Sequence, residues 1–248
     1  MIKKVIKKIL GISEVSINKV GTYNESTRIA WLENTLKKIP QGLRILDAGA
    51  GEQQFKKLCT HLNYVSQDFA QYKPEELPEG LQMDKWDYGA LDIVSDIASI
   101  PEADSSFDAI MCTEVFEHII NPIDAVREFS RLLKKNGYII ITAPFCSLTH
   151  FAPYHFYSGF NKYFYENALK LNDFEIIEAT PNGNYFEYIA QEIRRLPSIA
   201  EKYSLKRLSG SEKKTLNNIL KMLDNFSRND QISSELLCFG YHILAKKK

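Results

Sequence analysis

Short apolar runs alternate with amphipathic stretches along most of the chain, and each pattern predicts a different element. Runs of apolar and β-branched residues, typical of buried strands, occur at residues 43–48, 64–67, 91–94, 107–112, 138–143 and 174–179. Between them, helical periodicity and capping signals predict helices at residues 24–39, 53–59, 122–135 and 159–171. Strands that alternate with helices predict an α/β fold, in which a doubly wound, mostly parallel sheet is covered on both faces.

The two ends of the chain depart from this alternation. Residues 184–228 have the pattern of polar helices, broken by Pro197 and Gly210, and the apolar run 237–244 predicts a last strand. We therefore predict one domain over residues 23–248 that carries a helical insert at about 184–230. Residues 1–22 are predicted to be a separate N-terminal segment.

The first twelve residues place apolar side chains and four lysines on opposite faces of a predicted helix. Such a helix packs on its own domain or on a partner subunit, and it can also make a peripheral contact with an anionic membrane. The lysines interrupt the apolar residues, so the segment does not have the pattern of a signal peptide.

The turn after the first predicted strand has the composition of a ligand-binding turn. Asp47, Gly49 and Gly51 lie between a strand and a helix, where glycines let a ligand approach the backbone. A dinucleotide fingerprint needs a further glycine where this chain has Gln54. An acid directly before the turn suits a ligand with a positive charge better than a pyrophosphate.

Further acids follow the next strands. Asp68, Asp96 and Glu114 come at the ends of the second, third and fourth strands, which meet at one edge of a parallel sheet. A carboxylate at Asp68 can accept both hydroxyls of a ribose, and Asp96 can accept from an adenine amino group. Each of these acids could instead cap a helix or lie in solvent.

The runs ILDAGAGEQQF, VSQDF, DIVSDI, FDAIMCTEVFEHI and REFSRLLKKNGYIIITAPF resemble the class I S-adenosylmethionine (SAM)-dependent methyltransferases. The similarity is greatest to the bacterial group with an LEHI…LKPGG run, and it covers about residues 24–180. It implies a Rossmann-like sheet of seven strands with the last one antiparallel, and SAM as the cofactor. The family often has a third glycine at the position of Gln53.

By this resemblance Gly49 and Gly51 wrap the methionine part of the cofactor, Asp68 holds the ribose, and Asp96 with Ile97 frames the adenine. Tyr23 and Arg28 are candidates for contact with the cofactor carboxylate. The complete set of predicted cofactor residues is Asp47, Gly49, Gly51, Asp68, Phe69, Asp96, Ile97, Thr113 and Glu114.

Methyl transfer to a hydroxyl is helped by a base that removes its proton, and histidine suits that role near neutral pH. The candidates are His118, directly after the fourth strand, and His150 and His155 in an aromatic loop after the fifth. We favour His155, since Pro153 provides a rigid approach to it. No metal site is expected, because no acid accompanies the histidines at ligand spacing.

Several functions are compatible with these features. The leading hypothesis is methyl transfer to a small-molecule acceptor, such as a sugar or an envelope glycan precursor. The alternatives are a protein methyltransferase and a methyltransferase-like binding module without catalysis. A nicotinamide oxidoreductase is disfavoured by Gln54 and the acids at the strand ends.

Charge and cysteine content limit the partners and the cellular location that we expect. Lys+Arg and Asp+Glu are both 31, so the net charge is zero and no nucleic-acid partner is expected. The four cysteines show no CxxC spacing, which fits a reducing cytoplasm. No apolar run is long enough to predict a membrane span. The oligomeric state is left open.

Overall fold

The computed structural model describes residues 19–74, 80–81 and 85–248, so the predicted N-terminal helix lies outside the described residues. The chain divides into two compact units. The larger unit comprises Asn24–Tyr185 and Ile232–Lys248, and the smaller comprises Phe186–Gln231 with the described residues up to Tyr23.

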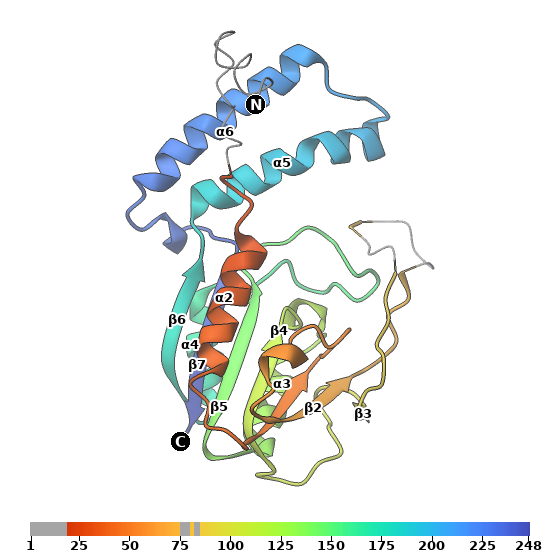
Figure 1. The fold of residues 1–248 in the computed structure, drawn as a ribbon, viewed down its shortest axis with the longest axis vertical. Coiled ribbons are helices and arrows are strands. Elements are labelled where there is room, and N and C mark those ends of the chain that lie inside the picture. The colour runs from red at the N-terminus through yellow and green to blue at the C-terminus, as the bar shows by residue number, and fades with distance from the viewer. Residues whose placement is uncertain (1–18, 75–79, 82–84) are drawn as a thin grey trace, which may run out of the picture. The chain divides into compact units, whose positions relative to one another are not determined.

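The larger unit is built on the seven-stranded sheet seen in Figure 1. Its strands are β1 (Arg44–Ala48), β2 (Asn63–Asp68), β3 (Ile93–Val94), β4 (Phe107–Thr113), β5 (Leu133–Pro144), β6 (Phe174–Asn182) and β7 (Gly240–Lys247). Their order across the sheet is β3-β2-β1-β4-β5-β7-β6. The first five strands pair in parallel, whereas β7 lies between β5 and β6 and is antiparallel to both. This confirms the predicted seven-stranded, mostly parallel, doubly wound sheet.

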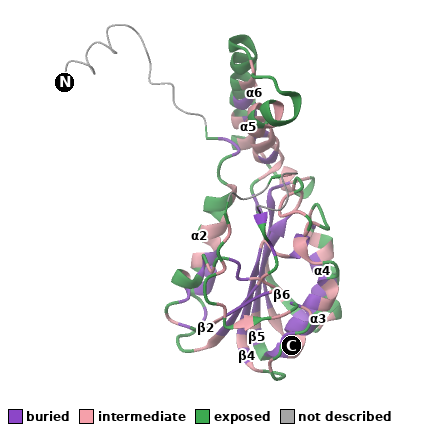
Figure 2. Cartoon of the chain, turned by 90° about the vertical axis from the view of Figure 1, so that its right-hand side faces the viewer, coloured by how far each residue is buried: buried purple, intermediate pink, exposed green. Residues whose placement is uncertain are grey.

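Helices cover both faces of this sheet, as Figure 2 shows by the buried strands between partly exposed helices. Helix α2 (Asn24–Leu36) places Leu32 and Leu36 in one core, against the face of the sheet that carries Ile45 and Met111. Helices α3 (Pro122–Leu132) and α4 (Lys162–Leu171) pack into a larger core on the opposite face. Two apolar faces of one sheet are thereby buried, as a mostly parallel sheet requires.

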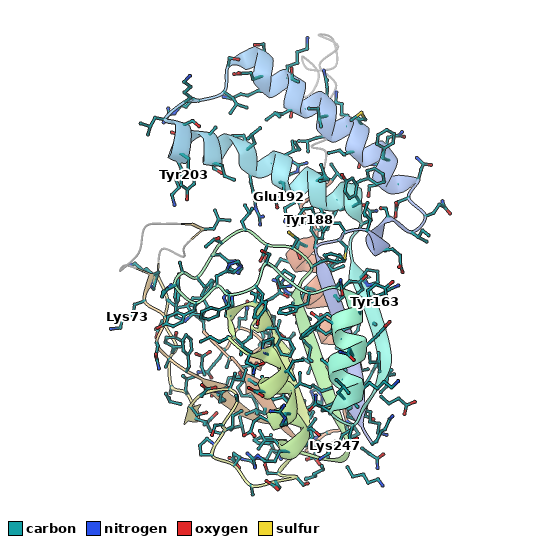
Figure 3. The ribbon with its side chains drawn as sticks, turned by 180° about the vertical axis from the view of Figure 1, so that it is seen from behind. Lys73, Tyr163, Tyr188, Glu192, Tyr203 and Lys247 are labelled. Atoms are coloured by element: carbon teal, nitrogen blue, oxygen red, sulfur yellow. The ribbon has the colours of Figure 1, made fainter. Side chains whose placement is uncertain are left out.

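The end of β7 is fixed to the end of α3. Lys247, labelled in Figure 3, donates from Nζ to the carbonyl oxygens of Ser130 and Leu133 at 2.6 and 2.8 Å. A cation at the C-terminal end of a helix interacts favourably with its exposed carbonyl groups and its dipole. This contact ties the last strand to the layer that covers the sheet.

The smaller unit contains α5 (Tyr185–Ser204, which starts in the larger unit) and α6 (Gly210–Arg228), joined by a short connection. Its apolar core consists of Val20, Ala190, Leu220 and Leu223. The helices predicted for this region are present, but the predicted break at Pro197 is wrong because α5 continues through it. Gly210 is the first residue of α6, after a capping box in which Ser209 and Glu212 bond to each other's backbone N–H groups.

The helix predicted at residues 53–59 is also wrong. Only the single 3₁₀ turn η1 (Lys56–Leu58) forms there, because Gln53 takes a φ of 57°, which right-handed helical backbone does not allow. The Gln53 side chain donates instead to the carbonyl oxygens of Tyr88 and Ala90. Gln53, at the position where the resemblance implies a glycine, therefore has the backbone conformation that favours glycine.

Among the described residues, no helix combines the length and the apolar character that crossing a membrane requires.

Candidate functional site

A cavity of about 1020 Å³ lies at the carboxyl ends of the parallel strands, where the strand order reverses between β1 and β4. All nine predicted cofactor residues line this cavity, and so do Arg28, His118 and His150. The topology explains this, because β1, β2, β3 and β4 all end at the same edge of the sheet. His155 is not among the lining residues.

The turn after β1 needs both of its glycines. Gly49 has a φ of 77°, and a Cβ there would lie 2.5 Å from Cγ2 of Val115. Gly51 has a φ of 50°, and its Cβ would lie 2.7 Å from the ring of Trp86. The turn therefore presents bare backbone to the cavity, with left-handed conformations that side chains disfavour.

Two buried carboxylates flank this turn. Asp68 accepts hydrogen bonds from the backbone N–H of Gly51 at 2.9 Å and of Ala70 at 3.0 Å. Asp47 accepts from the Tyr64 hydroxyl at 2.6 Å, and burial raises the pKa of Asp47 to about 7. Burial also raises the pKa of Asp68, although its backbone hydrogen bonds oppose the shift. Both carboxylates are desolvated, so a positively charged ligand would stabilise them in the ionised form.

The remaining predicted cofactor residues are placed differently. Ile97 is buried, whereas Asp96 is exposed and accepts from the backbone N–H of Ala98 in a turn. The Thr113 hydroxyl is buried without a hydrogen-bond partner among the described residues. Glu114 forms an ion pair of 3.0 Å with Arg28 and accepts from Thr142. Arg28 thus brings a positive charge from α2 into the cavity.

The other end of the cavity is formed by the 3₁₀ turn η3 (Phe116–His118) and the loop after β5. His118 Nδ1 lies 2.5 Å from the carbonyl oxygen of Tyr154, and His150 Nδ1 lies 2.8 Å from that of Leu148. The Nε2 atoms of His118 and His150 lie 3.7 and 3.8 Å from Oε1 of Glu117. Burial lowers the pKa of His118 to about 3, so that this imidazole is neutral at physiological pH.

The expectation that no acid accompanies these histidines is wrong. Glu117 is only 1% exposed, and its Oε2 has no hydrogen-bond partner among the described residues. Burial raises its pKa well above the usual range, and the nearby charge of Glu114 adds to the shift. The sequence signal was present in the spacing Glu114–Glu117–His118 after a strand, but sequence alone did not show that the 3₁₀ turn directs Glu117 toward His150.

His155 lies next to His150 and does not line the cavity. The ring centroids of His155 and His150 are 4.9 Å apart, and His155 Nε2 lies 3.2 Å from the Ser147 hydroxyl. Burial lowers the pKa of His155, and the charge of His150 adds to this effect. The favoured base candidate is thus next to the site rather than in its wall, while the other two histidines line the cavity.

The predicted aromatic loop is both part of the cavity wall and a packed cluster. Phe151 stacks on Tyr72 with a centroid distance of 4.4 Å and meets Trp86 edge-on at 4.9 Å. Tyr154 meets Phe69 edge-on at 4.9 Å. These rings also line the cavity. Sequence reasoning missed Trp86 and Tyr72, since they lie in a stretch with few periodic apolar residues.

Residues 46–141 match the model of a family described as a methyltransferase domain, and this match runs from β1 into β5. No curated protein sequence is similar enough to match the chain.

Solved structures share the fold at low sequence identity. A SAM-dependent methyltransferase from Archaeoglobus fulgidus is 17% identical with a TM-score of 0.50, over 88% of this chain and 94% of that one. Geranyl diphosphate methyltransferase in complex with GPP and sinefungin is 14% identical with a TM-score of 0.52, over 90% and 78% of the two chains. The [4+2]-cyclase SpnF is 16% identical with a TM-score of 0.52, over 88% and 80%. At these identities the likeness shows a common fold, and the acceptor must be argued from the site.

Proposed function

We propose that this chain is a class I SAM-dependent methyltransferase that transfers a methyl group to a hydroxyl of a small molecule, a sugar or an envelope glycan precursor. The observation that carries this proposal is the cavity at the carboxyl ends of the strands, where the glycine turn and the buried acids line one end and hydrogen-bond acceptors line the other. Its volume of about 1020 Å³ is at the upper end for ligand pockets, which leaves room for a small acceptor beside a cofactor.

The residues at the cofactor end fit SAM. A Cβ on Gly49 or Gly51 would collide with Val115 or Trp86, so this turn keeps its shape at the cavity only with glycine at both positions. Asp47 and Asp68 offer negative charge in a desolvated place, which suits a cationic ligand and ribose hydroxyls. When bound, SAM supplies an electrophilic methyl group on a positively charged sulfur.

The acceptor end favours a ligand with several hydrogen-bond donors. Glu117 Oε2 has no donor among the described residues, and His118 and His150 present nitrogen atoms beside it. A hydroxyl group can donate to the unpartnered oxygen of Glu117, while Phe151 and Tyr154 provide a flat apolar wall. An acceptor rich in hydroxyls and of limited size therefore fits better than an apolar one.

The chain's own contribution to the reaction is to hold the acceptor oxygen in position and to receive its proton. Positioning alone supplies much of the rate in reactions of this kind. The three candidate bases remain His118, His150 and His155. The first two line the cavity, and the third adjoins His150.

The test begins with cofactor binding measured by calorimetry, in which SAM or its demethylated product should bind in the micromolar range and NAD far more weakly. Release of the demethylated product is then followed with a panel of free and nucleotide-linked sugars, with peptides as the contrasting panel. Transfer to peptides alone would favour a protein methyltransferase. Tight binding of SAM without transfer to any acceptor would favour the binding module.

The cysteines support our proposal that the protein is located in the cytoplasm. All four are free thiols, and Cys59, Cys112 and Cys238 are buried. This supports the proposed cytoplasmic location, where thiols stay reduced.

A further inference from the structure

Three side chains at the acceptor end converge in the manner of a metal site. The carboxylate of Glu117 and the imidazoles of His118 and His150 each bring one ligand atom to within 4.8 Å of the others. The two His Nε2 atoms are 3.7 and 3.8 Å from the same carboxylate oxygen. Tetrahedral coordination with bonds of about 2.1 Å separates neighbouring ligand atoms by roughly 3.4 Å, so the two nitrogen–oxygen distances would each have to shorten by only about 0.3–0.4 Å.

The backbone fixes which nitrogen of each ring faces the centre. A carbonyl oxygen only accepts hydrogen bonds, so His118 Nδ1 donates to Tyr154 and His150 Nδ1 donates to Leu148. In a neutral imidazole the proton on Nδ1 leaves the lone pair on Nε2, the atom that points toward Glu117 in both rings. Metal-binding histidines are held in this way, with the second ring nitrogen donating to a carbonyl or carboxylate.

Glu117 provides the independent sign that a ligand belongs here. Its side chain is 1% exposed, its Oε2 lacks a hydrogen-bond partner among the described residues, and its Oε1 lies beyond hydrogen-bond distance of both rings. Burying a carboxylate oxygen without a partner is costly. A cation at this position would give the buried carboxylate a positive partner, and the Nε2 atoms of His118 and His150 lie close enough to the carboxylate to bind the same cation.

The neighbouring side chains Glu114 and His155 have other partners, so we expect three ligands from this chain, Glu117, His118 and His150. Glu114 is already engaged by Arg28 and by the Thr142 hydroxyl, and His155 Nε2 contacts Ser147. Because the cavity extends to His118 and His150, the remaining positions of a bound cation would face the acceptor space. Sites with two histidines and one carboxylate keep open positions for water or substrate.

We propose that Glu117, His118 and His150 bind one divalent transition-metal cation, of the Zn²⁺, Mn²⁺ or Co²⁺ class, whose open positions take the hydroxyl oxygens of the acceptor. The role of this cation in binding the acceptor rests on the proposed function, whereas the metal site itself does not. A cation there fixes the acceptor oxygen and lowers the pKa of its hydroxyl. The hydroxyl proton leaves to His155 or to solvent water, so that two of the three candidate bases serve as ligands instead.

The experiment uses the full chain after removal of metal with a chelator, and Co²⁺ as the probe because its visible absorption reports the ligand set. We expect one Co²⁺ per chain, competed by Zn²⁺ and insensitive to excess Mg²⁺, which prefers an all-oxygen shell. Glu117→Gln keeps the shape of the side chain and should weaken Co²⁺ binding at least tenfold. His150→Gln should do the same.

The matched control is His61→Gln, since His61 contacts the Leu36 carbonyl and does not line the cavity. It should bind Co²⁺ as the wild type does. SAM affinity, measured on every variant, shows that each is folded. If the wild type binds no Co²⁺, or if Glu117→Gln and His150→Gln bind it with unchanged affinity and spectrum, the site is refuted.

The outcome separates this inference from the proposed function. Transfer to a sugar hydroxyl that survives chelation, with no metal bound, would overturn the metal site and leave the proposed function in place. Co²⁺ binding that depends on Glu117 and His150 would support the site even if only peptides were methylated, a result that would overturn the proposed acceptor.

Discussion

The two ends of the cavity are built on different principles. At the cofactor end, Asp68 is the last residue of β2 and Gly51 lies in the turn after β1, and the Asp68 carboxylate accepts hydrogen bonds from the backbone within the protein. At the acceptor end, Glu117 and His150 come from separate loops and leave a buried oxygen without a partner among the described residues. The first end is therefore preorganised by the sheet, and we propose that the second is completed by what binds to it.

This difference has a consequence for mutations. Changes at the cofactor end should alter both folding stability and cofactor affinity, because the same atoms serve both. Changes at the acceptor end should alter turnover while the fold and the affinity for SAM stay near those of the wild type.

The largest effect is expected at the acceptor end. Replacing His150 by alanine should lower turnover by roughly 10²–10⁴, the range for losing a general base or a comparable catalytic group. The SAM dissociation constant should stay within a factor of about three. His61→Ala is the control, and the measurement is steady-state turnover beside calorimetry. A parallel loss of turnover and SAM affinity would break the distinction between the two ends.

The next largest effect is expected at the glycine turn. Gly49→Ala combines a positive φ of 77° with a contact of 2.5 Å to Val115, and SAM affinity should fall more than about 100-fold. Gly42→Ala isolates the backbone effect, because Gly42 has a φ of 81° with nothing within 4 Å of a Cβ. That control should lose about 1–2 kcal/mol of unfolding free energy and keep its SAM affinity. Equal losses of affinity in both variants would show that backbone strain, and not the close approach, matters.

Asp68→Ala should have a smaller effect on the cofactor. Losing a hydrogen bond to a charged group costs about 1.5–3 kcal/mol, or roughly 10- to 150-fold in affinity for SAM. Asp108→Ala is the control, since Asp108 pairs with Lys134 and does not line the cavity. Calorimetry that finds Asp68→Ala unchanged, or NAD preferred by the wild type, would contradict the assignment of the ribose to Asp68.

The smallest effect is expected in the pH dependence. Burial raises the folded-state pKa of Asp47 to about 7 from an ordinary 3.8, so the folded chain keeps a proton that the unfolded chain loses between these values. Its contribution to stability is therefore present below about pH 4 and is lost as the pH rises through 7. The groups that face Asp47 are the Tyr64 hydroxyl, Asp68 and the thiols of Cys59 and Cys112.

A cationic cofactor prefers the ionised carboxylate, so SAM affinity should rise about threefold to tenfold between pH 6 and 8. Asp47→Asn, which cannot titrate, should flatten both the affinity profile and the stability profile. Profiles that are the same in the wild type and in Asp47→Asn would place the titrating group elsewhere.

The sequence by itself determined the sheet and the cofactor end. Alternating apolar runs identify the strands, and in a parallel sheet the residues directly after them must share one edge. Asp68, Asp96 and Glu114 therefore come together wherever the loops run. Gly49 and Gly51 could also be identified from the sequence, because both lie in the one turn that follows the first strand.

Only the tertiary structure decided the backbone at Gln53, the course of α5 and the acceptor end. Gln53 has a positive φ that a helical pattern does not reveal, and Pro197 is accommodated inside α5 against expectation. The meeting of Glu117 with His150, and the position of His155 behind them, depend on how the loop after β5 folds over η3. Loop positions follow from many long-range contacts rather than from local periodicity, which is why the pattern of residues could name these histidines but not the carboxylate they share.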